Sequence, residues 1–425
     1  MIKRLIAPII VLTMSISIGS AEYNYYRTLL DLTDTLGGVV QGSVETGWQN
    51  KPHGVVVAPD GHVWVNINSG VGRMEVLASG DTVHFKPIYC LDPETGQHAS
   101  FSPIEVLTFP DGTVDSLTAE SENSGSGYGI ALDADGHILS SHYKTLYKIN
   151  YMTGEGVAMF VADQRVTEAA ADDNGNIFLG SLYPGPMHIL DSDLNFVTNA
   201  IDSVHHINRS IVVTGDGMDM FLGSTWSGHG FSHWYSDFPG AVEYAPMDTF
   251  GVFQDVPACW EYVNSGFGVP AGAPGDSAYV ICADDLADTV FAETAVWASA
   301  LDLSPDGSEL VVGALTAVWG GPLGGTNWVF DMDDLSGPVD VIGNSHNEAG
   351  DGVGITDGPR GVSWDADGNT YVADFYANRI YHFAYSEDHD DDDIPHVATY
   401  YRTLLDLTDT LGGVVQGSVE TGWQN

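Results

Sequence analysis

The stretch that decides the fold is His53–Ile67, HGVVVAPDGHVWVNI, in which a Pro-Asp-Gly turn separates two apolar runs. Asp-Gly or Asn-Gly between two apolar runs is the strongest local signal of a β-hairpin, because the turn needs a residue that tolerates a positive φ. Six segments share this layout, and in each the Asp or Asn of the turn lies seven positions after the first residue. The six segments begin at His53, Tyr128, Thr167, Arg209, Ser299 and Arg360.

A hairpin that recurs with one internal spacing is typical of a β-propeller, in which every blade is a small antiparallel sheet. A single hairpin cannot bury its faces, whereas radial stacking buries each sheet against its neighbours. The sequence therefore predicts an all-β fold, a six-bladed β-propeller over residues 51–385. A seventh, degenerate blade near Cys282 is the alternative. Because a ring of sheets must join its first blade to its last, we expect the segment 22–50 to supply a terminal strand that closes the last blade.

The segments KPHGVVVAPDGHVWV, from Lys51, and GPRGVSWDADGNTYVAD, from Gly358, resemble NHL repeats and the related SMP-30/gluconolactonase-like propellers. The resemblance extends over roughly residues 51–385. It implies a propeller but no particular activity, because propellers of this kind host unrelated functions. The SMP-30-like lactonases use a Glu early in the first blade, with Asn and Asp ligands around a channel metal. Here that opening reads WQNKPHG, and Glu45 lies outside the motif. We therefore predict binding or assembly, with a metal-dependent lactonase, hydrolase or lyase as the alternative.

Residues 1–21 have the layout of a cleaved signal peptide, with Lys3 and Arg4, the apolar run Leu5–Ile18 and the small residues Gly19–Ala21. We expect an exported bacterial protein, secreted or held at the cell surface. The apolar run is too short to span a bilayer and no later segment is apolar enough, so we predict no membrane insertion.

The formal net charge of −45, from 13 Lys and Arg against 58 Asp and Glu, argues against nucleic acid as a partner. The acidity suits a salty medium or cation binding, so we expect either no cofactor or calcium. Cys259 and Cys282 could pair, which would leave Cys90 over. Three cysteines are too few for a disulfide scaffold, so the fold must depend on a packed core.

The 26 residues YYRTLLDLTDTLGGVVQGSVETGWQN occur twice, as Tyr25–Asn50 and as Tyr400–Asn425. The second copy falls in the segment 397–425, after an acidic linker at 386–396. Two copies of one closing strand compete for one position, and the copy left over can complete another molecule. Such a head-to-tail exchange builds filaments, with the protein itself as partner. The assembly residues would be Tyr25, Tyr26, Leu29, Leu30, Tyr400, Tyr401, Leu404 and Leu405. A misassembled gene, an engineered fusion or a chain cut inside a tandem second propeller also explains the duplication.

The start of each inner strand and the loop after the second strand share one face of a propeller, around the axial channel. Arg209 and Arg360 fall in one ring on that face, which suits an anionic ligand or an ion pair with Glu168. Aromatic side chains on adjoining loops could stack on sugars, so an extracellular glycan is an alternative partner of a carbohydrate-binding propeller. The ligand-binding candidates are His53, Tyr128, Glu168, Arg209, Arg360, Tyr183, Trp226 and Tyr376.

Two motifs raise the question of a metal. His229 and His233, with the pair His205 and His206, could bind zinc, but no Cys pair or His-Glu-x-x-His motif accompanies them. They remain weak metal candidates. The DADG segments at 133–136 and 365–368 resemble the start of a calcium loop but lack its later ligands. Turn chemistry is the simpler interpretation of these segments.

Overall fold

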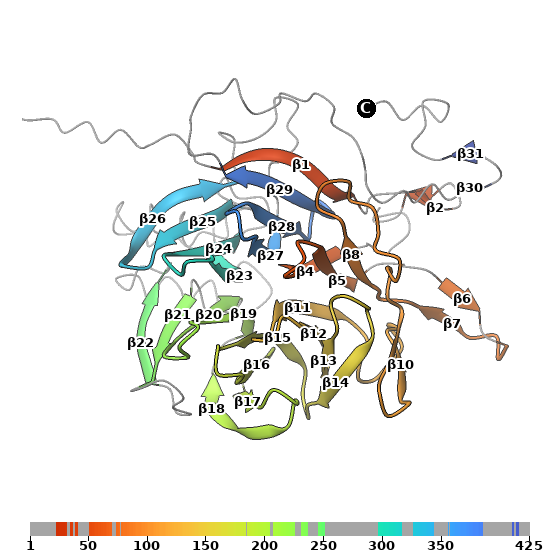
Figure 1. The fold of residues 1–425 in the computed structure, drawn as a ribbon, viewed down its shortest axis with the longest axis horizontal. Helices are drawn as coiled ribbons and strands as arrows, with labels where there is room; N and C mark the ends of the chain where they lie inside the picture. The colour runs from red at the N-terminus through yellow and green to blue at the C-terminus, as the bar shows by residue number, and fades with distance from the viewer. Residues whose placement is uncertain are drawn as a thin grey trace, which may run out of the picture.

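A computed structural model describes residues 23–31, 35–36, 39–40, 51–69, 74–76, 78–183, 185–204, 207–225, 231–236, 245–250, 296–316, 326–343, 356, 358–385, 410–411 and 414–415. This part of the chain forms strands and turns and contains no helix long and apolar enough to span a bilayer. Six antiparallel sheets surround a common axis, which confirms the predicted six-bladed β-propeller (Figure 1).

Blades 2 to 5 are each four strands that follow one another along the chain, numbered outward from the axis. Blade 2 contains β11 (Gly127–Leu132), β12 (Ile138–His142), β13 (Thr145–Ile149) and β14 (Gly156–Val161). Blade 3 contains β15 (Val166–Ala171), β16 (Ile177–Ser181), β17 (Gly185–Leu190) and β18 (Phe196–Val204). Blade 4 contains β19 (Ile207–Val213), β20 (Asp219–Thr225), β21 (Phe231–Tyr235) and β22 (Ala245–Phe250). Blade 5 contains β23 (Val296–Leu303), β24 (Glu309–Thr316), β25 (Thr326–Asp331) and β26 (Asp334–Ile342).

Blade 1 departs from this pattern, because its sheet has three strands among the described residues. They are β4 (Lys51–Val57), β5 (Val63–Ser69) and β8 (Ile88–Leu91). Isolated bridges from Ile88 to Ile104 and from Leu91 to His98 pair the outer edge of β8 with a following loop. Four two-stranded pairs complete the set: β6 (Met74–Val76) with β7 (Thr82–His84), β9 (Val106–Thr108) with β10 (Val114–Ser116), β2 (Thr35–Leu36) with β3 (Val39–Val40), and β30 (Thr410–Leu411) with β31 (Val414–Val415).

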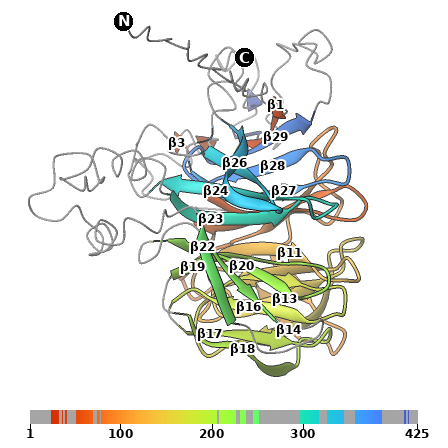
Figure 2. The same cartoon turned by 90° about the vertical axis from the view of Figure 1, so that its left-hand side faces the viewer.

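Blade 6 is the closing blade, and its outer strand comes from near the start of the chain. Its strands are β27 (Pro359–Trp364), β28 (Thr370–Asp374), β29 (Arg379–Tyr385) and β1 (Tyr23–Asp31). β1 runs antiparallel to β29, from Tyr23 opposite Tyr385 to Asp31 opposite Arg379. Figure 1 shows the red β1 along the blue β29, and Figure 2 shows the same pair from the side. The N-terminal copy of the duplicated strand therefore closes the ring. The C-terminal copy contributes the described pair β30 and β31, whereas Tyr400, Tyr401, Leu404 and Leu405 lie outside the described residues.

Side chains as well as backbone pairing hold β1 in place. Leu29 is fully buried in an apolar cluster between blades 6 and 1 that includes Val55 and Ile380. The ring of Tyr25 packs edge-on against Tyr381 and Phe383, with centroids 6.0 Å apart in both pairs. Burial of one such side chain stabilises a fold by about 1.5 to 3 kcal/mol, so β1 is anchored by its own side chains.

The core lies between neighbouring blades, where one apolar cluster fills each of the six interfaces. The inner strands β4, β11, β15, β19, β23 and β27 pack side by side around the axis. Gly54 shows how close they come. A Cβ at this position would lie 2.7 Å from the backbone N of Ile130 and the backbone O of Tyr128 in β11. Only glycine lets the two inner strands approach this closely.

The repeated turn keeps its predicted chemistry, with the positive φ on the glycine. In blade 1 the N–H of Gly61 donates to the carbonyl of Ala58 at 2.8 Å, and Gly61 has φ +84°. Gly136 and Gly368 occupy the corresponding positions with φ of +81° and +85°. The hairpins therefore use a tight turn followed by a left-handed glycine, which is the geometry of three-residue hairpin loops.

Candidate functional site

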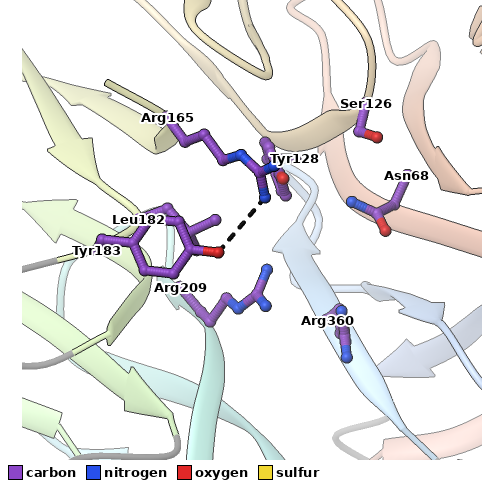
Figure 3. Close-up of a pocket in the computed structure, with 8 residues that line it drawn as sticks. All are labelled: Asn68, Ser126, Tyr128, Arg165, Leu182, Tyr183, Arg209 and Arg360. Carbon is purple, nitrogen blue, oxygen red and sulfur yellow. Dashed lines mark hydrogen bonds between the residues drawn. The ribbon is translucent and has the colours of Figure 1, made fainter. Parts of the chain in front are cut away.

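A pocket of about 160 Å³ opens at one end of the axial channel (Figure 3). Side chains from blades 1, 2, 3, 4 and 6 reach into it. The residues that line it are Asn68, Ser126, Tyr128, Arg165, Leu182, Tyr183, Arg209 and Arg360. Three of these residues are arginines and none is acidic. The pocket thus gathers positive charge in a strongly acidic protein.

The repeat explains why these side chains meet. Tyr128, Arg209 and Arg360 are the first residues of three repeats, at the same height on the inner strands β11, β19 and β27. Ser126 and Arg165 lie two residues before the first residue of their own repeats, and residues two apart along an extended chain point to the same side. The fold therefore repeats one position around the axis, and the side chain at that position varies from blade to blade.

Arg209 reaches across the axis from blade 4 to blade 1. Its Nη1 lies 3.5 Å from Nε2 of His53, and both side chains are buried. The ring of His53 also packs edge-on against Tyr128 and Phe375, at centroid distances of 5.5 and 6.4 Å. Burial, followed by the charges of Arg360 and Arg209, lowers the pKa of His53 well below its usual value. The imidazole is therefore neutral beside Arg209.

Arg360 lies flat on an aromatic ring at the edge of the pocket. Its guanidinium carbon is 3.6 Å from the centroid of Phe375, and the side chain also hydrogen-bonds to Tyr376. Its Nε is buried and has no hydrogen-bond partner among the described residues. Burial, followed by the charge of Arg209, lowers the pKa of Arg360 to about 9. The two arginines are therefore close enough to repel each other.

Arg165 is held by two tyrosines on the opposite wall. Its Nη1 donates to the hydroxyl of Tyr183 at 3.4 Å, the contact drawn in Figure 3, and its Nη2 donates to the hydroxyl of Tyr143 at 3.1 Å. The guanidinium also lies over the Tyr143 ring, 4.5 Å from its centroid. The hydrogen bond to Tyr143 is the largest cause of a raised pKa of Arg165. Arg165 is thus a fixed positive charge.

Lys51 adds a fourth cation beside the pocket. Its Nζ lies 4.5 Å from the centroid of Phe375 and 5.1 Å from that of Tyr376, the two rings next to Arg360. Sequence reasoning missed both Lys51 and Arg165 as site residues. Each lies two residues before the first residue of its repeat. Side chains two residues apart on a strand point to the same side, so including that earlier position in the repeat would have found both.

The predicted ligand-binding residues separate into three groups. Tyr128, Tyr183, Arg209 and Arg360 line the pocket, and His53 and Tyr376 contact its arginines. Glu168 lies elsewhere on the inner ring. Trp226 lies outside the described residues, as does the metal candidate His229.

Glu168 does not form the predicted ion pair with Arg209 or Arg360. Its Oε2 accepts a hydrogen bond of 3.2 Å from the backbone N–H of Ile211 in the next inner strand. Burial raises the pKa of Glu168 well above its usual value, against the hydrogen bonds from the N–H groups of Ile211 and Ile130. The carboxyl group therefore joins neighbouring blades through their backbones, and it leaves the positive charge of the pocket in place.

Asp302 joins blade 5 to blade 6 in a similar way. Its Oδ2 accepts a hydrogen bond of 2.9 Å from the backbone N–H of Trp364. Burial is the main cause that raises the pKa of Asp302 to about 7. Two buried carboxyl groups thus bind backbone N–H groups of adjacent inner strands.

His233, one of the weak metal candidates, contacts other side chains. Nε2 of His233 is 2.7 Å from Oδ1 of Asp219, and its ring stacks on Phe221 at 4.5 Å. Within the described ranges, a group of potential metal ligands occurs at Asp133, Asp135 and His137 in a turn of blade 2.

That blade 2 turn contains one of the two DADG segments. Asp133 accepts the N–H groups of Asp135 and His137, at 3.0 and 2.8 Å, and its Oδ2 lies 2.5 Å from Nζ of Lys148. These contacts agree with the interpretation of the DADG segment as turn chemistry.

A search with protein-family models finds no match for this chain, and a search of curated proteins finds none either. The propeller architecture is shown by the structure, whereas the resemblance to NHL and SMP-30-like propellers stays a prediction from the repeat motifs. The function of the chain must therefore be argued from its pocket.

Proposed function

We propose that this protein is a non-catalytic binding propeller that takes a small anionic ligand at the mouth of its axial channel. The observation that supports this function is the convergence of Arg165, Arg209 and Arg360 on one pocket. The whole chain has 13 Lys and Arg against 58 Asp and Glu, so three arginines in one small pocket are a marked concentration of positive charge. Guanidinium groups bind carboxylate, phosphate and sulfate through paired, charge-assisted hydrogen bonds.

The electrostatics of the pocket favour an anion. Burial is the largest cause of the lowered pKa of Arg360, and the charge of Arg209 lowers it further, so the two cations destabilise each other in the ligand-free protein. An anion between them would replace this repulsion by two attractions. Lys51, beside Phe375 and Tyr376, would add to the positive potential at the same place.

The same cations make a metal-dependent lactonase, hydrolase or lyase the weaker candidate. A divalent cation at the channel mouth would be repelled by Arg209 and Arg360. Glu168, the carboxyl group among the predicted site residues, accepts the backbone N–H of Ile211. We therefore favour ligand binding over metal-dependent catalysis at this site.

The anion site can be tested by thermal unfolding of the full chain with increasing acetate, phosphate or sulfate. Chloride at equal ionic strength serves as the reference, because salt alone screens the repulsion within an acidic protein. A ligand that binds the folded state raises the melting temperature in a saturable way. We expect this rise for the parent chain and for Arg379→Gln, which removes a cation that does not line the pocket, and a much smaller rise for Arg360→Gln. Equal behaviour of the two variants, or no saturable rise with any anion, would refute the site.

We further propose that the protein is exported and that its blades are of the NHL or SMP-30-like type. The layout of residues 1–21 and the repeat motifs support this. Expression of the full chain in a bacterium, followed by N-terminal sequencing of the exported protein, tests the first part. A mature chain that begins near Glu22 is expected, and an uncleaved protein that stays in the cytoplasm would contradict it.

Self-assembly is a second candidate function, and the closing strand is the observation that favours it. β1 fills the outer position of blade 6 within its own chain, and a second copy of Tyr25–Asn50 follows the propeller at Tyr400–Asn425. That second copy would add to another molecule by replacing its β1. Light scattering of the full chain and of a chain without residues 397–425 tests this. Concentration-dependent oligomers that vanish with the deletion are expected, and a strictly monomeric full chain would exclude assembly.

A further inference from the structure

We infer that the ligand of the channel-mouth pocket is a carboxylate on a six-membered ring. Arg209 and Arg360 would bind the carboxylate, and the wall formed by Tyr183 and Leu182 would contact the ring. This inference rests on the proposed function and narrows it from any small anion to one class. Inorganic phosphate and sulfate, which are compact and tetrahedral, become the alternatives to exclude.

The first argument is the geometry of the arginines. The terminal nitrogens Nη1 and Nη2 of Arg165 already donate to the hydroxyls of Tyr183 and Tyr143. Phe375 covers one face of the Arg360 guanidinium, whose N–H donors all lie in the guanidinium plane. Edge-on guanidinium groups match the flat, two-oxygen edge of a carboxylate. A tetrahedral anion can accept the same paired hydrogen bonds, but its further oxygens would need donors from other directions, and Arg165 already donates to two tyrosines.

The second argument is the size of the pocket. Its volume of about 160 Å³ is close to the roughly 150 Å³ of an engineered protein cavity that holds a benzene ring. Acetate or phosphate would leave most of this space unfilled. A single six-membered ring with its carboxylate fits the available volume, whereas a chain of such rings would extend beyond the pocket.

The third argument is the chemistry of the wall opposite Arg360. Figure 3 shows Tyr183 and Leu182 on one side of the pocket and Asn68 and Ser126 on the other. The first pair offers a ring face and a methyl-bearing side chain for contact with a ligand ring. The second pair offers an amide and a hydroxyl that can bind substituents. An aromatic acid and a sugar acid share the required chemistry, and the experiment must separate them.

The experiment is calorimetric titration of the full chain with glucuronate, benzoate, acetate and phosphate at one ionic strength. We expect at least one of the ring carboxylates to bind at least about tenfold more tightly than acetate and phosphate, which corresponds to one or two added contacts. Tighter binding of glucuronate than of benzoate identifies a hydroxylated ring, and the reverse order identifies an aromatic one. Either order supports the inference.

Two pairs of variants make the test specific. Tyr183→Ala should reduce the difference in affinity between the ring carboxylates and acetate, because it removes the aromatic wall and leaves Arg209 and Arg360 in place. Its matched control is Tyr235→Ala, since Tyr235 is exposed to the same degree, 41% against 42%, and does not line the pocket. Arg360→Gln should weaken binding of all carboxylates about 10- to 100-fold, and Arg379→Gln should not.

The outcomes separate the two levels of the proposal. Phosphate or acetate binding as tightly as both ring carboxylates would overturn the inference of a ring carboxylate while the anion site stands. If Tyr183→Ala left the difference in affinity between ring carboxylates and acetate unchanged, the proposed contact of Tyr183 with the ligand ring would be overturned. Absence of binding by every anion tested would overturn both this inference and the proposed function.

Discussion

Blade 2 and blade 6 are both four-stranded antiparallel sheets, but their outer strands are held in different ways. In blade 2 the outer strand β14 follows β13 through a tight turn at 150–154, and its Met159 and Val161 are exposed. In blade 6 the outer strand β1 has no such turn, because it pairs with β29 across almost the whole propeller sequence. It instead buries Leu29 completely.

The difference shows what must replace covalent connection when a ring closes. Joining distant parts of a chain costs loop-closure entropy, which grows with the logarithm of the loop length. A strand tied by a short turn avoids most of this cost, so β14 needs few side-chain contacts. β1 offsets the cost with Leu29, with the Tyr25 ring, and with Arg27, which donates to the carbonyl of Glu94 in blade 1.

The strongest way to break this comparison is to remove β1. Deletion of residues 22–31 in a chain that also lacks 397–425 should destabilise the propeller by at least about 5 kcal/mol, because the core cluster loses Leu29 and β29 becomes an open edge. Urea unfolding measures the loss. The chain that lacks only 397–425 is the control, and equal stability of the two would contradict the closing role of β1. Restoring 397–425 to the deleted chain then shows whether the second copy can replace the first.

A single substitution sharpens the comparison. Leu29→Ala should cost about 2 to 5 kcal/mol, the usual range for a fully buried leucine. Met159→Ala at the outer strand of blade 2 should change stability by no more than about 0.5 kcal/mol, because that side chain is 39% exposed. Both are measured by urea unfolding. Similar losses at the two positions would mean that closing and contiguous outer strands are anchored alike.

A smaller effect is expected from the aromatic contacts of Tyr25. Edge-on aromatic pairs contribute about 0.5 to 1.5 kcal/mol beyond burial, so a double-mutant cycle of Tyr25→Leu with Phe383→Leu should give a coupling energy in that range. A coupling energy indistinguishable from zero would show that the ring contact does not help to hold β1.

A pH-dependent effect concerns a feature that the two blades share, the contact of an inner strand with a carboxyl group from another blade. Asp302 binds Trp364 of blade 6, and its pKa is about 7 against an ordinary value of 3.8. The folded state therefore holds this proton more tightly than the unfolded state. The resulting stability is fully present below about pH 4 and is lost as the pH rises through about 7.

In the parent chain, the urea concentration at the midpoint of unfolding should therefore fall between pH 4 and 8. Asp302→Asn should make this fall smaller. Glu168→Gln should do the same, because burial also raises the pKa of Glu168. Parallel curves for the parent chain and both variants would show that neither group titrates with folding in this range.

The fold could be predicted from the sequence because its signal is local and repeated. Each Asp-Gly or Asn-Gly turn fixes a hairpin through the left-handed glycine, and one internal spacing relates the six hairpins. The closing strand also followed, from the requirement that a ring leaves no open edge. The three-stranded sheet of blade 1 could not be predicted, because its outer edge is paired by a loop with no strand pattern, as the bridge from Ile88 to Ile104 shows.

Among the cations of the candidate site, only those at the first position of a repeat were predicted. Arg209 and Arg360 begin their repeats and were found, whereas Arg165 and Lys51 lie two residues earlier and were missed. Glu168 was placed on the correct ring, but its partner is a backbone N–H of a neighbouring strand. No residue pattern marks such an acceptor, because every backbone has the same donor.

The position of β1 also determines when the protein can finish folding. Ribosomes make chains from the N-terminus, so β1 emerges before the other strands of blade 6, and its partner β29 emerges after blades 1 to 5. With roughly 350 residues between them, synthesis at 5 to 20 residues per second keeps the strand waiting for about 20 to 70 seconds. Throughout that interval a nascent chain carries an unpaired, aromatic-rich strand. Escort by a chaperone, or delivery across the membrane before folding, would protect it until the last blade exists.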